Sequence, residues 1–581
     1  MANRQRGRRP HGRMGRRAFL RLAALMGGGL TAAVACRGSE EGPLTTTDGT
    51  IAQAADGSLV LGPGEPHTVR TELAQAQADR ARRRRSLAVF HHLTDFRIVD
   101  EESPLRSEWL ESCPRPLSTS AFRPQESLSL QAADAMIARA NRIDRSQVTG
   151  RRVDFAFHTG NAADNAQYNE LRAFLDLLDG KTVHPDSGSP GYSGAQKESP
   201  EAAYPDLLVA AQKEFVSAGL AYPWYAAVGN RDVLIQANFP VTAAATTIAV
   251  GSEKIISLGP QARAEVCESS QSLLEPDASG RVVNDPDSVV QNVSPDPERR
   301  PLSKVEWLEE HFNTQARPGP AGHGFSAGNV AAGSAYYVLD HGPIRFIVLD
   351  TVNYGGFAAG SMDAAQFAWL EEQLKAASSS YFGKGAGRVS TGNQDRLIVI
   401  VSHHGADAMT NPFPGPAGEQ RLRGTDLEAL LHRFPNVMLH VAGHSLEHRI
   451  TARPDASGAT KGYWQITTAS PLDYPMQSRL LEIADNGDGT LSIFSTTYDT
   501  AAPLAPGAAK DPTPDEDGVN QRLLASTARR VGMGDPQLNR QATGLSASDR
   551  NAELLLPAPF ALAAVPTPAR HEPAGDPSGR S

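Results

Sequence analysis

The chain has 581 residues, 40% of them hydrophobic and 21% charged, which is typical of a globular protein with a large core and argues against global disorder. Its formal net charge at pH 7 is −9. Residues 1–35 contain eight arginines and no acidic residue, so the rest of the chain has 48 basic and 65 acidic residues, a net charge of −17. A body this acidic is repelled by the phosphates of nucleic acids, which excludes them as generic partners.

The first 36 residues have the pattern of an export signal. A basic region precedes an apolar stretch, residues 22–35, that is too short and glycine-rich for a good membrane span. Arg16 and Arg17, followed by "AFL", are similar to a twin-arginine signal, which sends folded proteins across the bacterial membrane. Cys36 follows "AVA", similar to a lipobox without its usual leucine, so cleavage with and without lipidation both stay open. The sequence predicts an extracytoplasmic protein, either secreted or anchored as a lipoprotein.

The remaining chain divides by composition. We expect a linker over residues 37–86, which are small and polar and end in "RARRRR"; a main domain over 87–500; a C-terminal extension over 501–555 with a helix packing on the domain; and a disordered tail rich in proline and alanine over 556–581. Cys113 and Cys267 could pair outside the cytoplasm or stay free, and the sequence favours neither.

Short β-branched runs alternate with longer amphipathic ones in the main domain, the pattern of an α/β fold. The predicted strands are 87–90, 153–157, 224–228, 345–350, 397–402 and 437–442, and the predicted helices are 363–377 and 425–434. Three later runs, 463–468, 479–483 and 491–497, favour antiparallel strands. "DNGDGT" (485–490) predicts a hairpin turn, because it lacks the downstream glutamate of a calcium-binding loop.

Polar clusters stand at the ends of five predicted strands. They are "TDFR" (94–97), "HTGNAADN" (158–165), "VGNRD" (228–232), "VSHHG" (401–405) and "VAGHSLEH" (441–448). Ligands of open α/β sheets bind beyond the carboxyl ends of the strands. Five such clusters in one chain predict a functional site at that edge.

In order and spacing, these stretches resemble the motif blocks of the calcineurin-like metallophosphoesterases: Asp-x-His, Gly-Asp, Gly-Asn-His-Asp or Glu, His, and Gly-His-x-His. The resemblance covers roughly residues 87–500, and "TDFRIVDEESP" and "ADNAQYNELR" look like an exported bacterial subfamily. It implies a four-layer α/β/β/α sandwich of mixed sheets and a phosphoester hydrolase with divalent Mn, Fe or Zn. In that chemistry two cations about 3.5–4 Å apart share a bridging carboxylate, activate a water and hold the phosphoryl oxygens.

The resemblance assigns metal-ligand positions to Asp95, Asn161, Asn230, His403 and His444, with His404 as the alternative to His403. Four family positions are substituted: Arg97 replaces the first histidine, Asn161 the bridging aspartate, Arg231 the catalytic histidine and Leu446 the last histidine. One of the two metals would keep Asp95 as its only ligand, whereas the other would keep Asn230, His403 and His444 as ligands. We therefore predict one bound divalent metal at most, or none.

Arg97 and Arg231 would stand beside the lost metal. A guanidinium is permanently charged and suited to bidentate contact with phosphate, so both arginines are predicted to bind substrate. The alternative is that Arg97 and Asp95 form a buried ion pair in a disused cavity. Six polar residues near the blocks could serve as substitute ligands, but they lack the family spacing, and turn, strand or surface roles explain them more simply: His91, Asp100, His158, Asp164, Glu447 and His448.

Three functions stay open. The first is a protein that binds phosphate or a phosphorylated small molecule with weak or no dinuclear hydrolysis. The second is an active phosphoester hydrolase that uses a single metal or substitute ligands, and the third is a non-catalytic surface scaffold. A membrane contact is expected only through the N-terminus, if it is lipidated.

Overall fold

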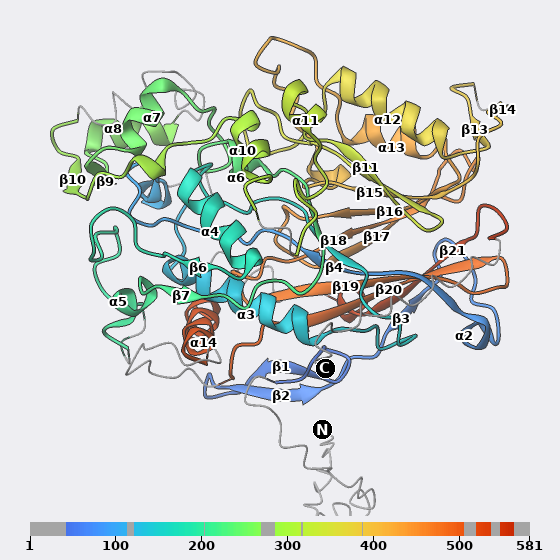
Figure 1. Ribbon diagram of the computed structural model, residues 1–581, viewed down its shortest axis with the longest axis horizontal. Helices are drawn as coiled ribbons and strands as arrows, with labels where there is room; N and C mark the ends of the chain where they lie inside the picture. Colours follow the sequence, from blue (N-terminus) through green and yellow to red (C-terminus); the bar gives the residue numbers. More distant parts are fainter. Residues whose placement is uncertain are drawn as a thin grey trace, which may run out of the picture. The chain divides into compact units, whose positions relative to one another are not determined.

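The computed structural model describes residues 42–112, 121–200, 202, 204–268, 285–314, 318–385, 387–504, 519–535 and 546–562. The predicted export signal, Cys36 and Cys113 lie outside these residues. Within them, the chain forms two large β-sheets with helices on their outer faces (Figure 1).

The first sheet has seven strands in the order β3-β21-β20-β19-β4-β5-β8. Their bounds are β3 Thr68–Arg70, β4 Arg85–Leu93, β5 Phe155–His158, β8 Trp224–Ala226, β19 Gln477–Asp485, β20 Thr490–Asp499 and β21 Ala552–Pro557. β4, β5 and β8 are parallel to one another, whereas β19 pairs antiparallel with both β4 and β20. The turn between β19 and β20 is the predicted hairpin.

The second sheet has six strands in the order β11-β12-β15-β16-β18-β17. Their bounds are β11 Tyr337–His341, β12 Ile344–Val348, β15 Leu397–Val401, β16 Val437–Ala442, β17 Arg449–Arg453 and β18 Tyr463–Thr467. The four central strands, β12, β15, β16 and β18, are parallel, and an antiparallel strand flanks them on each side. All five residues of β15 ("LIVIV") are buried, as expected for a strand covered on both faces.

The two sheets pack face to face through phenylalanines. The ring of Phe346 in β12 lies 5.5 Å from those of Phe90 and Phe155 and 5.3 Å from that of Phe157, all in the first sheet. Because side chains alternate along a strand, His158 of β5 points to the opposite face, where its ring lies 4.6 Å from Phe174.

Helices cover both outer faces. α3 (Ser129–Arg142) and α4 (Tyr168–Asp179) pack on the first sheet, and α12 (Ala364–Ala376) and α13 (Gly424–Leu431) pack on the second. The layers are helix, sheet, sheet and helix, which confirms the predicted four-layer α/β/β/α fold of mixed sheets. The strands and helices predicted in the main domain are all present.

The other elements are short or peripheral. They are β1 Gly49–Gln53, β2 Leu59–Pro63, α2 Arg80–Arg83, η1 Glu108–Ser112, η2 Glu126–Leu128, β6 Thr182–Val183, α5 Leu207–Ala211, β7 Phe215–Val216, α6 Asn230–Val233, α7 Ala243–Ala249, β9 Glu253–Ser257, α8 Pro260–Glu268, β10 Val289–Asn292, η4 Pro297–Arg299, α10 Lys304–Glu310, α11 Ala327–Ala332, β13 Ser380–Phe382, β14 Arg388–Ser390, η5 Ala406–Ala408, α14 Val519–Met533 and α16 Ala547–Arg550.

The prediction of a linker over residues 37–86 is wrong for residues 42–86, the part of it that the structure describes. β1 and β2 form a hairpin, and β3 pairs with β21 at the edge of the first sheet. Two arginines of the "RARRRR" run, Arg80 and Arg84, form ion pairs with Glu553 of β21 at 2.7 and 2.6 Å. The basic run is therefore held by a partner that lies far away in the sequence.

The C-terminal extension contains the expected helix. Leu524 and Ala528 of α14 lie in one apolar cluster with Ala132 of α3. The extension also supplies β21, which was not predicted. This strand ends at Pro557, inside the region that was predicted to be a disordered tail. Phe560 and Leu562 pack against the main core, so disorder beginning at residue 556 is wrong for the described residues.

Two further observations concern Cys267 and the membrane. Cys267 is disulfide-bonded and packs against Trp109 and Leu110. Its predicted partner, Cys113, lies outside the described residues. In the described part of the chain, every helix is too short or too polar to span a bilayer.

Candidate functional site

The polar strand ends from both sheets meet at one edge. Asp95 follows β4, Asn161 follows β5, Asn230 begins α6 after β8, His403 follows β15 and His444 follows β16. Two contacts join the sheets: the backbone N–H of His444 donates to Asp95 Oδ2 at 2.9 Å, and His403 Nε2 lies 2.9 Å from Asn230 Oδ1. The metal-ligand positions named by the resemblance thus lie together in space.

The carboxylate of Asp95 is fully buried, and each of its two oxygens has two hydrogen-bond donors. Its Oδ1 accepts from Asn161 Nδ2 at 2.8 Å and lies 3.3 Å from Arg97 Nε. Its Oδ2 accepts from Thr94 Oγ1 and from the His444 backbone, both at 2.9 Å. Burial raises the pKa of Asp95, but His403, Arg97 and these hydrogen bonds outweigh it and hold the pKa well below the usual range. The ionised carboxylate is therefore satisfied by protein donors.

Asn161 links two of the site's turns. Its Nδ2 donates to Asp95, while its Oδ1 accepts from the backbone N–H of Arg231 at 2.8 Å. An aspartate in this place could not donate to Asp95, because an ionised carboxylate only accepts. At the position where the resemblance implies a bridging aspartate, Asn161 therefore joins Asp95 and Arg231 by hydrogen bonds.

The backbone at these positions is in the left-handed region. The φ angles are 54° at Asp95, 49° at Arg97, 57° at Asn161, 66° at His444 and 60° at Leu446. This conformation costs roughly 1–2 kcal/mol for a residue with a Cβ, and it persists only where the surrounding structure imposes it. Arginine and leucine seldom adopt this region, unlike asparagine, aspartate and histidine, so the φ angles of Arg97 and Leu446 mark turns that the surrounding structure imposes.

Two glycines and Asp232 hold these turns together. A Cβ on Gly160 would lie 2.5 Å from the nitrogen of Gly229, so only glycine permits this approach. The carboxylate of Asp232 accepts from the backbone N–H groups of Gly229, Asn161 and Ala163 at 2.7, 2.9 and 3.1 Å. Asp232 was not among the predicted site residues, although it ends the "VGNRD" motif; it positions the site.

Three histidines lie close enough to share a metal ion. The ligand atoms of His403, His404 and His444 are all within 4.8 Å of one another. Both nitrogens of His404 are engaged, Nδ1 with Thr351 Oγ1 at 2.8 Å and Nε2 with the carbonyl of Ala358 at 2.9 Å. His444 Nδ1 is buried and has no hydrogen-bond partner in the described part of the chain. His444 is therefore better placed than His404 to offer a lone pair.

His403 and Asn230 present two lone pairs to each other. His403 Nδ1 lies 2.7 Å from the carbonyl of Thr159, which requires an N–H there. Burial lowers the pKa of His403 to about 3, so the ring is neutral and its Nε2 carries a lone pair. Asn230 Nδ2 faces the carbonyls of Ala237 and Ala358, both at 3.3 Å, which turns its Oδ1 toward that nitrogen. A cation bound to both atoms would remove the repulsion, so Asn230, His403 and His444 fit one divalent metal.

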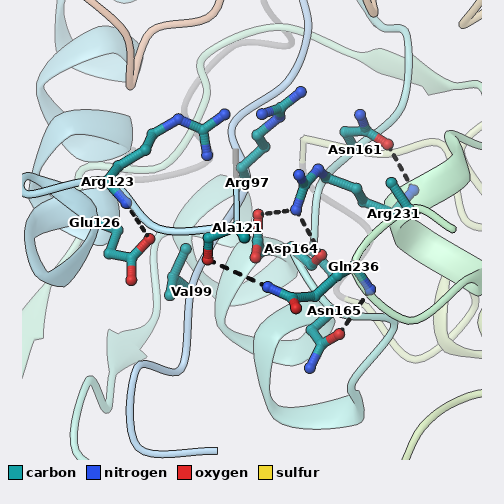
Figure 2. A network of polar contacts seen from close by, with 12 residues as sticks. Arg97, Val99, Ala121, Arg123, Glu126, Asn161, Asp164, Asn165, Arg231 and Gln236 are labelled. Atoms are coloured by element: carbon teal, nitrogen blue, oxygen red, sulfur yellow. Dashed lines mark hydrogen bonds and ion pairs between the residues drawn. The ribbon is translucent and has the colours of Figure 1, made fainter. Parts of the chain in front are cut away.

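Arg231 lies in a buried network around Asp164 (Figure 2). Its Nη1 is 2.5 Å from Asp164 Oδ1, and Arg106 Nη1 is 2.7 Å from Asp164 Oδ2. Burial lowers the pKa of Arg231 to about 9, and Asp164 opposes this shift. The structure thus gives Arg231 an ion-pair partner, and its predicted contact with substrate stays a prediction.

The other polar residues near the motif blocks have structural contacts. Asp100 pairs with Arg299 at 3.0 Å, Glu447 pairs with Arg449 at 2.6 Å, and His448 accepts from Arg479 at 2.9 Å. His91 contacts the hydroxyl of Tyr498 at 2.9 Å. With Asp164 in its ion pairs, the observed contacts agree with the simpler interpretation of these residues.

Of the comparisons with known proteins, only the one with solved structures found matches. Neither a protein-family model nor a curated protein sequence matches the chain. A dimetal phosphatase from Danio rerio is 12% identical with a TM-score of 0.32, over 72% of this chain and 100% of that one. A purple acid phosphatase from seeds of yellow lupin (Lupinus luteus) is 10% identical with a TM-score of 0.26, over 77% of this chain and 56% of that one. These values are too low to transfer a property of either protein to this chain.

Proposed function

We propose that the chain is an exported calcineurin-like metallophosphoesterase that binds phosphate or a phosphorylated small molecule at the edge of its two sheets, with little or no hydrolysis by two metals. The surroundings of the Asp95 carboxylate support this proposal most strongly. Four protein donors surround its carboxylate, and Arg97 places a permanent positive charge 3.3 Å from it. Arg97 and Asn161 thus do for Asp95 what a cation would otherwise do.

Hydrolysis with a single metal is the second candidate, and the facing lone pairs of His403 and Asn230 favour it. Asn230 Oδ1, His403 Nε2 and His444 Nδ1 would hold one Mn, Fe or Zn ion. Such an ion supplies Lewis-acid chemistry when bound. The chain's own residues orient these atoms: the carbonyl of Thr159 fixes the tautomer of His403, and two carbonyls fix the amide of Asn230.

Assays of an aryl phosphomonoester, with and without added Mn²⁺, separate the candidates. The first proposal predicts that the purified protein binds the ester but that Mn²⁺ produces little turnover. Turnover that needs Mn²⁺ and disappears in His403→Ala would support the single-metal hydrolase instead. A protein that neither binds nor hydrolyses the ester would be a scaffold with a vestigial site.

A further inference from the structure

Arg123, in the loop before η2, is a second buried arginine near Arg97 that no motif block includes. Arg97 is 4% exposed and Arg123 is 1% exposed. The charge of Arg123 is the strongest electrostatic influence on Arg97 after burial, and both effects lower the pKa of Arg97. Figure 2 draws the side chains of Arg97 and Arg123 next to each other in one buried network, where two positive charges repel each other. Each has one carboxylate beside it, Asp95 for Arg97 and Asp473 for Arg123.

The guanidinium nitrogens of this pair are poorly satisfied. In the described part of the chain, Arg97 Nη1 and Arg123 Nε, Nη1 and Nη2 are buried without a hydrogen-bond partner. In Figure 2 the dashed contact of Arg123 starts at its backbone nitrogen, which donates to Glu126 at 2.9 Å. A buried charged donor without an acceptor costs more than a neutral one, so four such nitrogens on two neighbouring side chains indicate a missing acceptor.

Asp473 is the counter-ion of Arg123, but it does not accept a hydrogen bond from the guanidinium group of Arg123. Arg123 Nε lies 2.9 Å from Asp473 Oδ1, in a geometry that is not that of a hydrogen bond, and both carboxylate oxygens of Asp473 are without one in the described residues. Asp473 and Leu446 also line a cavity of about 280 Å³. This cavity is large enough for a tetrahedral oxyanion, and it reaches Asp473, the carboxylate that pairs with Arg123.

We propose that Arg97 and Arg123 form a two-arginine site for a tetrahedral oxyanion, either free phosphate or the phosphoryl group of a monoester, which displaces Asp473 from Arg123. Two guanidinium forks offer the paired N–H donors that phosphate oxygens accept. Arg231 is not part of this site, because Asp164 already holds it. The proposal rests on the proposed function for its ligand class, but it places the anion on arginines instead of on a metal.

Calorimetric titration of the purified full-length protein with inorganic phosphate, in chelator and at constant ionic strength, tests this site. We expect binding without metal, weakened about tenfold or more by Arg123→Gln and less by Arg123→Lys, which keeps the charge but loses the fork. Arg145→Gln changes an arginine that is half exposed and should bind like the unaltered protein. A parallel titration with an aryl phosphomonoester distinguishes the two sources of the phosphoryl group by their affinities.

The outcomes separate the two proposals. Binding that requires Mn²⁺ and is unaffected by Arg123→Gln would overturn the two-arginine site and leave the proposed function standing. If neither phosphate nor the ester binds, with or without Mn²⁺, both proposals fail. If Arg123→Gln does not fold, crystals of the unaltered protein soaked in tungstate provide the test. We expect the anomalous peak of tungsten between Arg97 and Arg123. A peak at His403 and His444 instead, or no peak, would contradict the site.

Discussion

The side-chain amide of Asn161 donates a hydrogen bond of 2.8 Å to the carboxylate of Asp95. At these two positions the proposed function implies a pair of metal-binding carboxylates. Asn161→Asp should therefore bring two carboxylates together in a fully buried place. Without a cation they repel each other, so we expect a loss of roughly 1–3 kcal/mol in stability, the cost of an unsatisfied buried polar group.

Thermal unfolding of Asn161→Asp, with and without Mn²⁺, checks this relationship. Added Mn²⁺ should recover part of the lost stability, because a cation can bridge the two carboxylates. Asn161→Ala removes the amide without adding a charge and serves as the control that Mn²⁺ should not rescue. A variant Asn161→Asp that is as stable as the unaltered protein in chelator would argue against the hydrogen-bond bridge.

Restoring all four substituted positions should create a dinuclear site. The combined variant Arg97→His, Asn161→Asp, Arg231→His and Leu446→His returns the family pattern, and the left-handed backbone at three of these positions suits turns that present ligands. We expect it to gain bound metal and phosphoesterase activity, whereas each single change should do little, because ligands that act as a unit are not additive.

Metal analysis and an aryl phosphoester assay measure that gain. Metal-dependent hydrolysis by the unaltered protein, at a rate that Asn161→Ala leaves unchanged, would contradict this expectation, since other residues would then hold the working metal.

Asp164 should be among the most sensitive positions for stability. It is the shared partner of Arg106 and Arg231, and its side chain is 1% exposed. Asp164→Asn would leave two buried guanidinium groups without their common counter-charge, and breaking a buried pair costs about 3–5 kcal/mol. Asp144→Asn removes an exposed partner of Arg145 and should cost about 0–1 kcal/mol. Equal shifts of the two urea unfolding midpoints would show that the buried network contributes little.

Much of the fold could be predicted from the sequence, because long apolar runs such as 397–401 have few alternatives to a buried strand. The five polar strand ends were likewise visible, and parallel strands bring such ends to one edge. β3 could not be predicted, because it is a three-residue edge strand whose partner, β21, lies more than 480 residues away. β21 lies between β3 and β20 and was also missed. Arg123 was missed because only tertiary packing brings it to the site, whereas Asp232 lies in the predicted cluster "VGNRD" and was not singled out there.

The proposed export signal makes a separate prediction. Replacing Arg16 and Arg17 with lysine keeps the charge but removes the paired arginines, so we expect the precursor to remain in the cytoplasm. Cell fractionation of tagged protein measures this, and a variant in which the hydrophobic stretch is intact and only Arg13 becomes lysine is the control. Normal export of the double variant would mean that another route carries the chain.

We infer that four protein donors stand around Asp95 in the place of a second metal. Elemental analysis of the purified mature protein by mass spectrometry tests this most directly. We expect at most one tightly bound divalent metal per chain, which is lost when His403 is changed to alanine. Two equivalents of iron, zinc or manganese per chain would contradict it.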